Sequence, residues 1–248
     1  MNSALRRFAD PICLDAAPSL SGMSAWVEHI PFGMNLVAAI RPEAIVELGT
    51  HAGDSYLALC HAVERCGIPA RCYAVDTWQG DPHTGAYGPE VLALLRALHD
   101  ARFGTFSRLV QSTFDDALPH FADGSIDLLH IDGVHTADAV RHDYETWRPK
   151  LSRRAVVLFH DTNVREHDFG VSVVWDELKA RHPHFEFLHG HGLGVLAPSE
   201  EVPAALLPLL EARGDDAGGV RAFFFELGRR ISVGLERDAL ARERDSLA

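Results

Sequence analysis

The sequence has no apolar run that approaches the ~20 residues needed to cross a lipid bilayer. Its N-terminus, MNSALRRFADPICLD, has two arginines but neither the continuous apolar segment nor the small-residue cleavage site of a secretory signal. Only four of the 248 residues are cysteine, and none form a Cys-x-x-Cys pair. We therefore expect reduced thiols, no membrane span and a cytoplasmic location.

Basic residues are also in the minority, with 23 Lys and Arg against 35 Asp and Glu. Because a nucleic-acid partner requires a basic face, this balance argues against such a partner. Apolar residues still make up 47% of the chain, so a sizeable core can be buried. The length fits one large domain, or one domain with an appendage.

Short apolar runs alternate along the chain with stretches whose apolar residues recur every three or four positions. The runs predict five buried strands: Ala44–Leu48, Arg71–Val75, Ser107–Gln111, Ile126–Ile131 and Ala155–His160. Between them, helices are predicted with these apolar stripes: Leu57, Cys60 and Val63; Val91, Leu94, Leu95 and Leu98; Val140, Tyr144 and Trp147; Val171, Val174, Trp175 and Leu178. This alternation indicates an α/β fold, a doubly wound parallel sheet with helices on both faces.

The end of this pattern is different. Phe185–His189 and Leu193–Ala197 are joined only by Gly190-His191-Gly192, which leaves no room for a crossover helix, so we predict an antiparallel hairpin. The sheet domain then covers residues 41–198, and residues 1–40 form a helical N-terminal cap. Residues 199–248 are predicted as a helical tail, and the part before Val220 has no clear helical pattern. The charged end of this tail is predicted to be a coiled coil, a docking helix or a linker to a further domain.

A glycine turn follows the first strand directly. Gly49 and Gly53 allow the backbone to approach a ligand, and the next helix offers free N–H groups to an anion. The segment is neither the Gly-x-Gly-x-x-Gly of a nicotinamide site nor a P-loop. The second strand ends in Asp76, where an acid can bind both hydroxyls of a ribose. The alternative is a tight turn that binds nothing.

Acidic residues also follow the fourth and fifth strands. Asp132 and Asp161 lie at carboxyl ends of strands, where ligands bind in open α/β sheets, and such oxygen ligands suit a divalent cation. His135 follows Asp132 by three residues, and the ordinary imidazole pKa near 6.5 suits a general base. The alternatives are structural or capping roles for these residues.

The motifs IVELGTHAGDSY, YAVDTWQGD, STFDDALP, LLHIDGVHTADAVRHDYETW and VVLFHDTN resemble the class I S-adenosylmethionine-dependent methyltransferases, family 24 type, over roughly residues 35–198. The resemblance implies a Rossmann-like, seven-stranded sheet with its last strand inserted antiparallel. It also implies that S-adenosylmethionine binds at Glu47, Gly49, Thr50, Gly53, Ser55, Asp76, Thr77, Trp78, Ser112, Thr113, Phe114 and Asp132. For Trp78, stacking on the purine and packing of the loop both stay open.

The edge acids are similar to those of metal-dependent sugar O-methyltransferases. That resemblance implies a divalent cation, Mg²⁺ or Mn²⁺, held by Asp132, His160 and Asp161, with Asp132 and His135 as catalytic residues. One departure is that His160 stands where the family has a second carboxylate, which also admits Fe²⁺ or Zn²⁺. Alternatively, His160 points into the core and Asn163 or a water completes the cation shell.

Two polar loops are predicted to contact the acceptor, namely Gln79–Pro89 with Asp81, His83 and Tyr87, and Thr162–Gly170 with Arg165 and His167. Their polarity favours a hydroxyl acceptor, on a sugar or glycoconjugate first and on a phenol second. His189 and His191 are predicted as surface residues of the hairpin turn, and His29 is assigned no partner.

The sequence is also compatible with other functions. A metal-independent methyltransferase would use His135 as its sole base. An iron oxygenase would use His135, Asp132 and His160 as a facial triad, but would leave the glycine turn and Asp76 unexplained. A catalytically idle, methyltransferase-like module would act through its C-terminal helix, which could also form a homo-oligomer or bind a partner from the same pathway.

Overall fold

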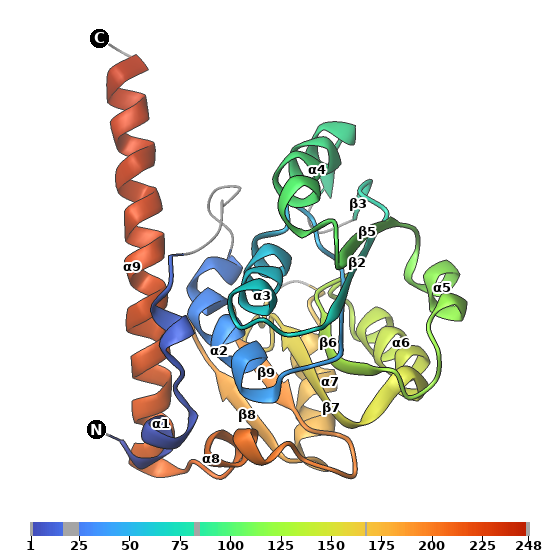
Figure 1. The fold of residues 1–248 in the computed structure, drawn as a ribbon, viewed down its shortest axis with the longest axis vertical. Helices are drawn as coiled ribbons and strands as arrows, with labels where there is room; N and C mark the ends of the chain where they lie inside the picture. Colours follow the sequence, from blue (N-terminus) through green and yellow to red (C-terminus); the bar gives the residue numbers. More distant parts are fainter. Residues whose placement is uncertain (1, 17–24, 82–84, 167, 247–248) are drawn as a thin grey trace.

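The computed structural model describes residues 2–16, 25–81, 85–166 and 168–246. Its centre is a seven-stranded sheet in the order β5-β2-β1-β6-β7-β9-β8 (Figure 1). The strands are β1 (Ala44–Leu48), β2 (Arg71–Asp76), β5 (Ser107–Gln111), β6 (Ile126–Ile131), β7 (Leu151–His160), β8 (His184–Phe187) and β9 (Leu193–Leu196). Five strands run parallel, whereas β9 is antiparallel to both β7 and β8. The α/β fold and the antiparallel strand inserted near one edge are thus confirmed.

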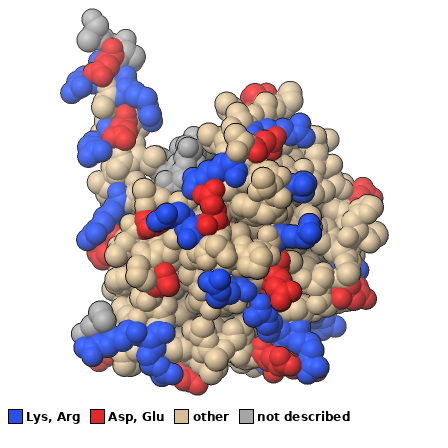
Figure 2. Space-filling model, viewed as in Figure 1, with Lys and Arg blue, Asp and Glu red and all other residues tan. Residues whose placement is uncertain are grey.

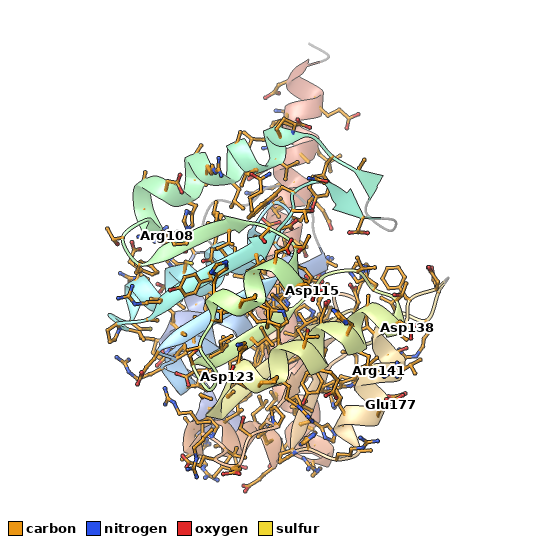
Figure 3. All side chains as sticks on the ribbon, turned by 90° about the vertical axis from the view of Figure 1, so that its right-hand side faces the viewer. Arg108, Asp115, Asp123, Asp138, Arg141 and Glu177 are labelled. Carbon is orange, nitrogen blue, oxygen red and sulfur yellow. The ribbon has the colours of Figure 1, made fainter. Side chains whose placement is uncertain are left out.

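Helices cover both faces of the sheet, because successive strand residues point to opposite sides. Ile45 packs with helices α2 (Ile30–Ile40) and α3 (Asp54–Arg65), while its neighbour Val46 packs with α6 (Ala137–Trp147) and α7 (Val171–Lys179). On the outer surface, Arg141 of α6 donates to Glu177 of α7 at 2.8 Å (Figure 3). The central strands β1 and β6 are therefore buried on both sides, whereas the edge strand β5 is partly exposed.

Helix α4 (Pro89–Phe103) is present where the sequence predicts a helix, but of the predicted apolar stripe only Leu95 is buried. Leu94 is 67% exposed and Leu98 is 39% exposed. The buried side chains are instead Leu92, Leu95, His99 and Phe103. A short ribbon of β3 (Gly80–Asp81) and β4 (Gly85–Ala86) precedes this helix and was not predicted.

The N-terminal segment is helical, as predicted, in α1 (Ser3–Phe8), η1 (Pro11–Leu14), η2 (Ala25–His29) and α2. It packs against the C-terminal helix α9 (Gly214–Ser246), whose far end projects from the body (Figure 1). Helix α9 begins at Gly214, within the stretch predicted to be mixed up to Val220. Figure 2 shows basic and acidic side chains interspersed along the projecting end.

One apolar cluster contains Phe32, Leu158 and Phe224, so the N-terminal, central and C-terminal parts share a core. The proposed boundaries at residues 40 and 198 stay predictions. The remaining elements are α5 (Phe114–Ala117), η3 (Leu118–His120), η4 (Arg148–Lys150), η5 (Ala204–Leu206) and α8 (Leu207–Leu210). Among the helices described, none combines the length and apolar character needed to cross a membrane.

Candidate active site

A cavity of about 500 Å³ lies at the carboxyl ends of the parallel strands. Most of the residues predicted for the site line it: Gly49, Thr50, Gly53, Ser55, Asp76, Thr77, Thr113, Phe114, Asp132, His135, His160 and Asp161. Glu47, Trp78 and Ser112 do not line the cavity. The topology therefore brings together residues that are far apart in sequence.

The glycine turn is fixed by close backbone contacts. Gly49 has a φ of +85°, and a Cβ on it would lie 2.1 Å from the carbonyl oxygen of Asp132. Gly53 has a φ of +88°, and its Cβ would lie 2.4 Å from Leu95. No side chain caps the first turn of α3 at Gly53, and this turn faces the cavity. A side chain at either glycine would fill space that the turn needs.

Asp76 organises this turn from the end of β2. Its Oδ2 accepts hydrogen bonds from the backbone N–H groups of Thr50 and His51, both at 2.8 Å, and Oδ1 accepts from the N–H of Trp78 at 2.7 Å. A carboxylate has about four acceptor positions and three are used here, so about one remains for a ligand hydroxyl. Asp76 is buried but still lines the cavity, which suits a ribose-binding acid.

Other residues predicted to bind the cofactor take different positions relative to the cavity. Trp78 is 2% exposed and its Nε1 donates to the His51 carbonyl at 2.9 Å, so the indole packs the loop. Ser112 contributes its backbone N–H to the Asp76 carbonyl. Thr113 caps α5 and faces the cavity together with Phe114, whose ring lies where a Cβ on Gly133 would be.

Glu47 lies inside the protein rather than on the cavity wall. Its side chain is fully buried, and Oε2 lies 2.8 Å from Nδ1 of His130 on β6. His130 Nε2 in turn lies 3.1 Å from Nε1 of Trp26, a residue of η2 that does line the cavity. The sequence analysis did not single out His130, since a histidine within an apolar run carries no signal beyond a strand position.

Two acids and two histidines converge at the ends of β6 and β7. His135 Nε2 lies 2.9 Å from Asp161 Oδ2 and 3.8 Å from Asp132 Oδ1. His160 Nδ1 lies 3.2 Å from Asp132 Oδ1 and 3.3 Å from Asp161 Oδ2. Asp161 has a φ of +61°, an unusual backbone conformation that turns the chain sharply after β7. We call these four residues the edge cluster.

The His160 ring is held by a backbone carbonyl. Its Nε2 donates to the Gly190 carbonyl at 3.0 Å, which turns Nδ1 toward the two carboxylates. The alternative in which His160 points into the core is therefore wrong, because its Nδ1 faces Asp132 and Asp161. Asn163 Nδ2 donates to the Leu188 carbonyl.

Electrostatics favour charged groups throughout the edge cluster. Burial opposes ionisation of Asp132, but His160 and His135 together hold the pKa of this carboxyl below its usual range, and the same pair lowers that of Asp161. Burial likewise opposes protonation of His135, yet the two carboxylates raise its pKa to about 9. The carboxylates also raise the pKa of His160. Without another cation, the imidazoles thus supply the compensating charge.

Ligand atoms of Asp132, His135 and Asp161 lie within 4.8 Å of one another, close enough for one metal ion among the residues described. The predicted set contained His160 in place of His135. Two carboxylates and an imidazole fixed through its other nitrogen match the donors that a divalent cation accepts. The edge cluster therefore fits the implied cation with either histidine.

Other histidines surround this cluster. His191 Nδ1 lies 3.2 Å from Asp161 Oδ1, and the residue lines the cavity although its side chain is 63% exposed. His29 is fully buried, with Nε2 3.1 Å from the Gly190 carbonyl, and stacks on His189 at 4.5 Å. His191 is exposed as predicted, whereas His189 is half-buried, because the hairpin turn folds back onto η2.

The acceptor loops are partly as predicted. Asp81 and Tyr87 line the cavity, as does Phe169, which stacks on His135 with ring centroids 4.7 Å apart. Arg165 instead donates to the carbonyls of its own loop. The predicted contacts of His83 and His167 lie outside the described residues.

Comparison with known proteins agrees with this arrangement. Residues 46–162 match the family model Methyltransf_24, a methyltransferase domain. The uncharacterized protein y4gI of Sinorhizobium fredii (strain NBRC 101917 / NGR234) is 51% identical over 192 residues, which cover 77% of this chain and 21% of that protein. The chain thus corresponds to about a fifth of the length of this relative.

Solved structures share the fold at low sequence identity. Cofactor-bound Rv0187 from MTB has a TM-score of 0.53 and 20% identity, over 77% of this chain and 91% of that chain. A putative caffeoyl-CoA O-methyltransferase from Staphylococcus aureus also has a TM-score of 0.53, with 13% identity, over 79% and 92% of the two chains. Together, the family match over residues 46–162 and the shared fold identify a methyltransferase domain within the chain.

Proposed function

We propose that the chain transfers the methyl group of S-adenosylmethionine to a hydroxyl of a sugar or glycoconjugate. The observation that carries this proposal is the edge cluster beside the glycine turn, since it puts two carboxylates and a candidate base next to the cofactor cavity. The methionine end of the cofactor would lie at Gly49 and Gly53, and its ribose at Asp76. The adenine would lie near Thr113 and Phe114.

The chemistry required is the removal of a proton from a poor nucleophile. As the acceptor oxygen attacks the methyl carbon, the bond from that carbon to sulfur breaks and S-adenosylhomocysteine leaves, while the hydroxyl proton passes to Nε2 of His135. Asp161, whose Oδ2 lies 2.9 Å from Nε2, would stabilise the protonated imidazole that this transfer produces. A positioned base of this kind contributes about 10²–10⁴-fold to the rate.

Asp132, Asp161 and His160 would hold the divalent cation. When bound, the cation supplies positive charge that makes the acceptor hydroxyl more acidic. It would also compensate the two carboxylates and so favour release of the proton from His135, which must be neutral to act as a base. The Gly190 carbonyl would keep His160 oriented through Nε2.

The cavity wall supports a hydroxylated acceptor. Asp81 and His191 supply polar groups to the cavity wall, which suits the many hydroxyls of a sugar. A phenol is the second candidate, because Trp26, Tyr87 and Phe169 also line the cavity and offer aromatic surface.

A panel of free sugars, glycosides, nucleotide sugars and catechols, incubated with methyl-labelled S-adenosylmethionine, tests this function. We expect label in a sugar, lost on chelation and restored by Mg²⁺ or Mn²⁺. His135→Asn should lower the rate ~10²–10⁴-fold. His142→Asn serves as the matched control, because this exposed histidine is paired with Asp115 outside the cavity.

The outcomes separate the alternatives. Label in catechols alone identifies the phenolic methyltransferase, and full activity under chelation identifies the metal-independent one. If His135→Asn retains full activity, the assignment of the base is wrong.

A further inference from the structure

Three buried side chains form a chain of hydrogen bonds beneath the cofactor cavity. Trp26, in the N-terminal segment, contacts His130 on β6 at 3.1 Å, and His130 contacts Glu47 on β1 at 2.8 Å. The two strands are neighbours in the sheet, and residues 47 and 130 are directly paired. All three residues are at most 3% exposed. We call this chain of contacts the Trp26–His130–Glu47 relay.

The direction of each hydrogen bond follows from the chemistry of the groups. The Trp26 indole N–H can only donate, so Nε2 of His130 must accept and carries no proton. Nδ1 of His130 must then hold the ring proton and donate it to Oε2 of Glu47. The relay therefore fixes both the tautomer of His130 and the orientation of the carboxyl group.

The second oxygen of Glu47 is incompletely satisfied. Oε1 is buried and has no hydrogen-bond partner among the residues described. Asp132 and Ser55 both line the cavity and lie close enough to the Glu47 carboxyl to affect its pKa. Asp132 raises this pKa and Ser55 lowers it. Burial raises the pKa of the Glu47 carboxyl above its ordinary value, although the hydrogen bond from His130 opposes this shift, so a nearby ammonium group would favour the ionised form.

We propose that His130 and Trp26 are positioning residues that hold the Glu47 carboxyl group behind the cavity wall at the glycine turn, so that its negative charge stabilises the ammonium group of the methionine end of the cofactor. This inference rests on the cofactor placement in the proposed function. Trp26 is seated tightly, because a Cβ on Gly33 would lie 2.7 Å from its ring. Through the relay, the N-terminal segment that lines the cavity also supports the cofactor end of the site.

Binding of two ligands distinguishes a positioning role of the relay from general damage to the fold. S-adenosylhomocysteine carries the ammonium group, whereas 5′-methylthioadenosine has the same nucleoside but lacks the amino-acid part. Equilibrium dialysis with both labelled ligands measures their affinities for each variant. His130→Leu removes the donor to Glu47, and should lower the affinity for S-adenosylhomocysteine about tenfold while leaving that for 5′-methylthioadenosine within about twofold.

Milder variants keep the test valid should His130→Leu fold poorly. His130→Asn retains an N–H near the place of Nδ1 and should restore most of the S-adenosylhomocysteine affinity. Trp26→Phe removes the indole donor and should lower that affinity about threefold. Trp147→Phe is the matched control, since this fully buried indole has no hydrogen-bond partner among the described residues and lies outside the cavity.

The relay is disproved if the His130 and Trp26 variants lower both affinities equally, or if neither affinity changes. A wild-type chain that binds neither ligand overturns the proposed function and, with it, this inference. Normal binding with an unchanged ratio of the two affinities overturns the relay alone.

Discussion

His135 is the residue on which the chemistry depends most. Without a cation, Asp132 and Asp161 raise its pKa to about 9, so at pH 7 the imidazole is protonated and cannot accept a proton from an acceptor. Rising pH releases this proton around pH 9. A divalent cation on the same carboxylates compensates their charge and should lower the His135 pKa, so that the neutral base is available near pH 7.

Nuclear magnetic resonance of the histidine ring protons measures the pKa of His135 directly, and the His135→Asn variant assigns its signal. We expect a His135 midpoint near pH 9 in chelator and a lower midpoint in saturating Mg²⁺. A midpoint near pH 6.5 without a cation would show that the carboxylates do not hold the proton.

Sequence reasoning found the residues at the strand ends, because acids there stand out against apolar runs. It missed the partners that fold onto them. His130 is hidden within a strand, and His29 meets the Gly190 carbonyl only because the N-terminal segment folds over the hairpin turn. Trp78 shows the same limit, since only the fold decides that its indole packs the loop.

The C-terminal helix supports the cavity through η2. A Cβ on Gly228 would lie 2.1 Å from the Glu28 carbonyl oxygen, and Ser232 donates to Oε1 of Glu28 at 3.0 Å. Glu28 follows Trp26 in η2 by two residues, so a shift of α9 should disturb the relay. The helix thus belongs to the architecture of the site.

We expect Gly228→Ala to lower the free energy of unfolding by about 1–3 kcal/mol through overpacking, and to weaken S-adenosylhomocysteine binding. Gly234→Ala is the control on the same helix, because its Cβ would meet nothing within 4 Å. It should stabilise the chain by about 0.5–1 kcal/mol. Denaturant unfolding measures both. Equal stability of the two variants would mean that the α9 contact with η2 is not close-packed.

The strands were predictable because parallel strands buried on both faces are continuous apolar runs. Helix α4 was predictable as a helix but not in its orientation. Its sequence offers Leu92, Leu94, Leu95 and Leu98 around most of the helix, and only contact with the body selects Leu92 and Leu95. Strands β3 and β4 are only two residues long, so their sequence shows no alternation of apolar and polar residues that could predict a strand.

At the scale of the whole molecule, one apolar cluster joins the N-terminal segment, the sheet and α9. The N-terminal segment lines the cavity, whose chemistry lies at the sheet edge, and α9 packs against that segment. The relative y4gI extends far beyond the matched region.

The central claim is that this cavity binds S-adenosylmethionine with its ribose on Asp76. Calorimetric titration of the chain with S-adenosylhomocysteine tests it most directly. We predict one site per chain, lost or weakened at least tenfold in Asp76→Ala and unchanged in Asp123→Asn, an exposed acid paired with Lys150 outside the cavity (Figure 3). No heat of binding from folded wild-type protein, or equal binding by Asp76→Ala, would contradict the account.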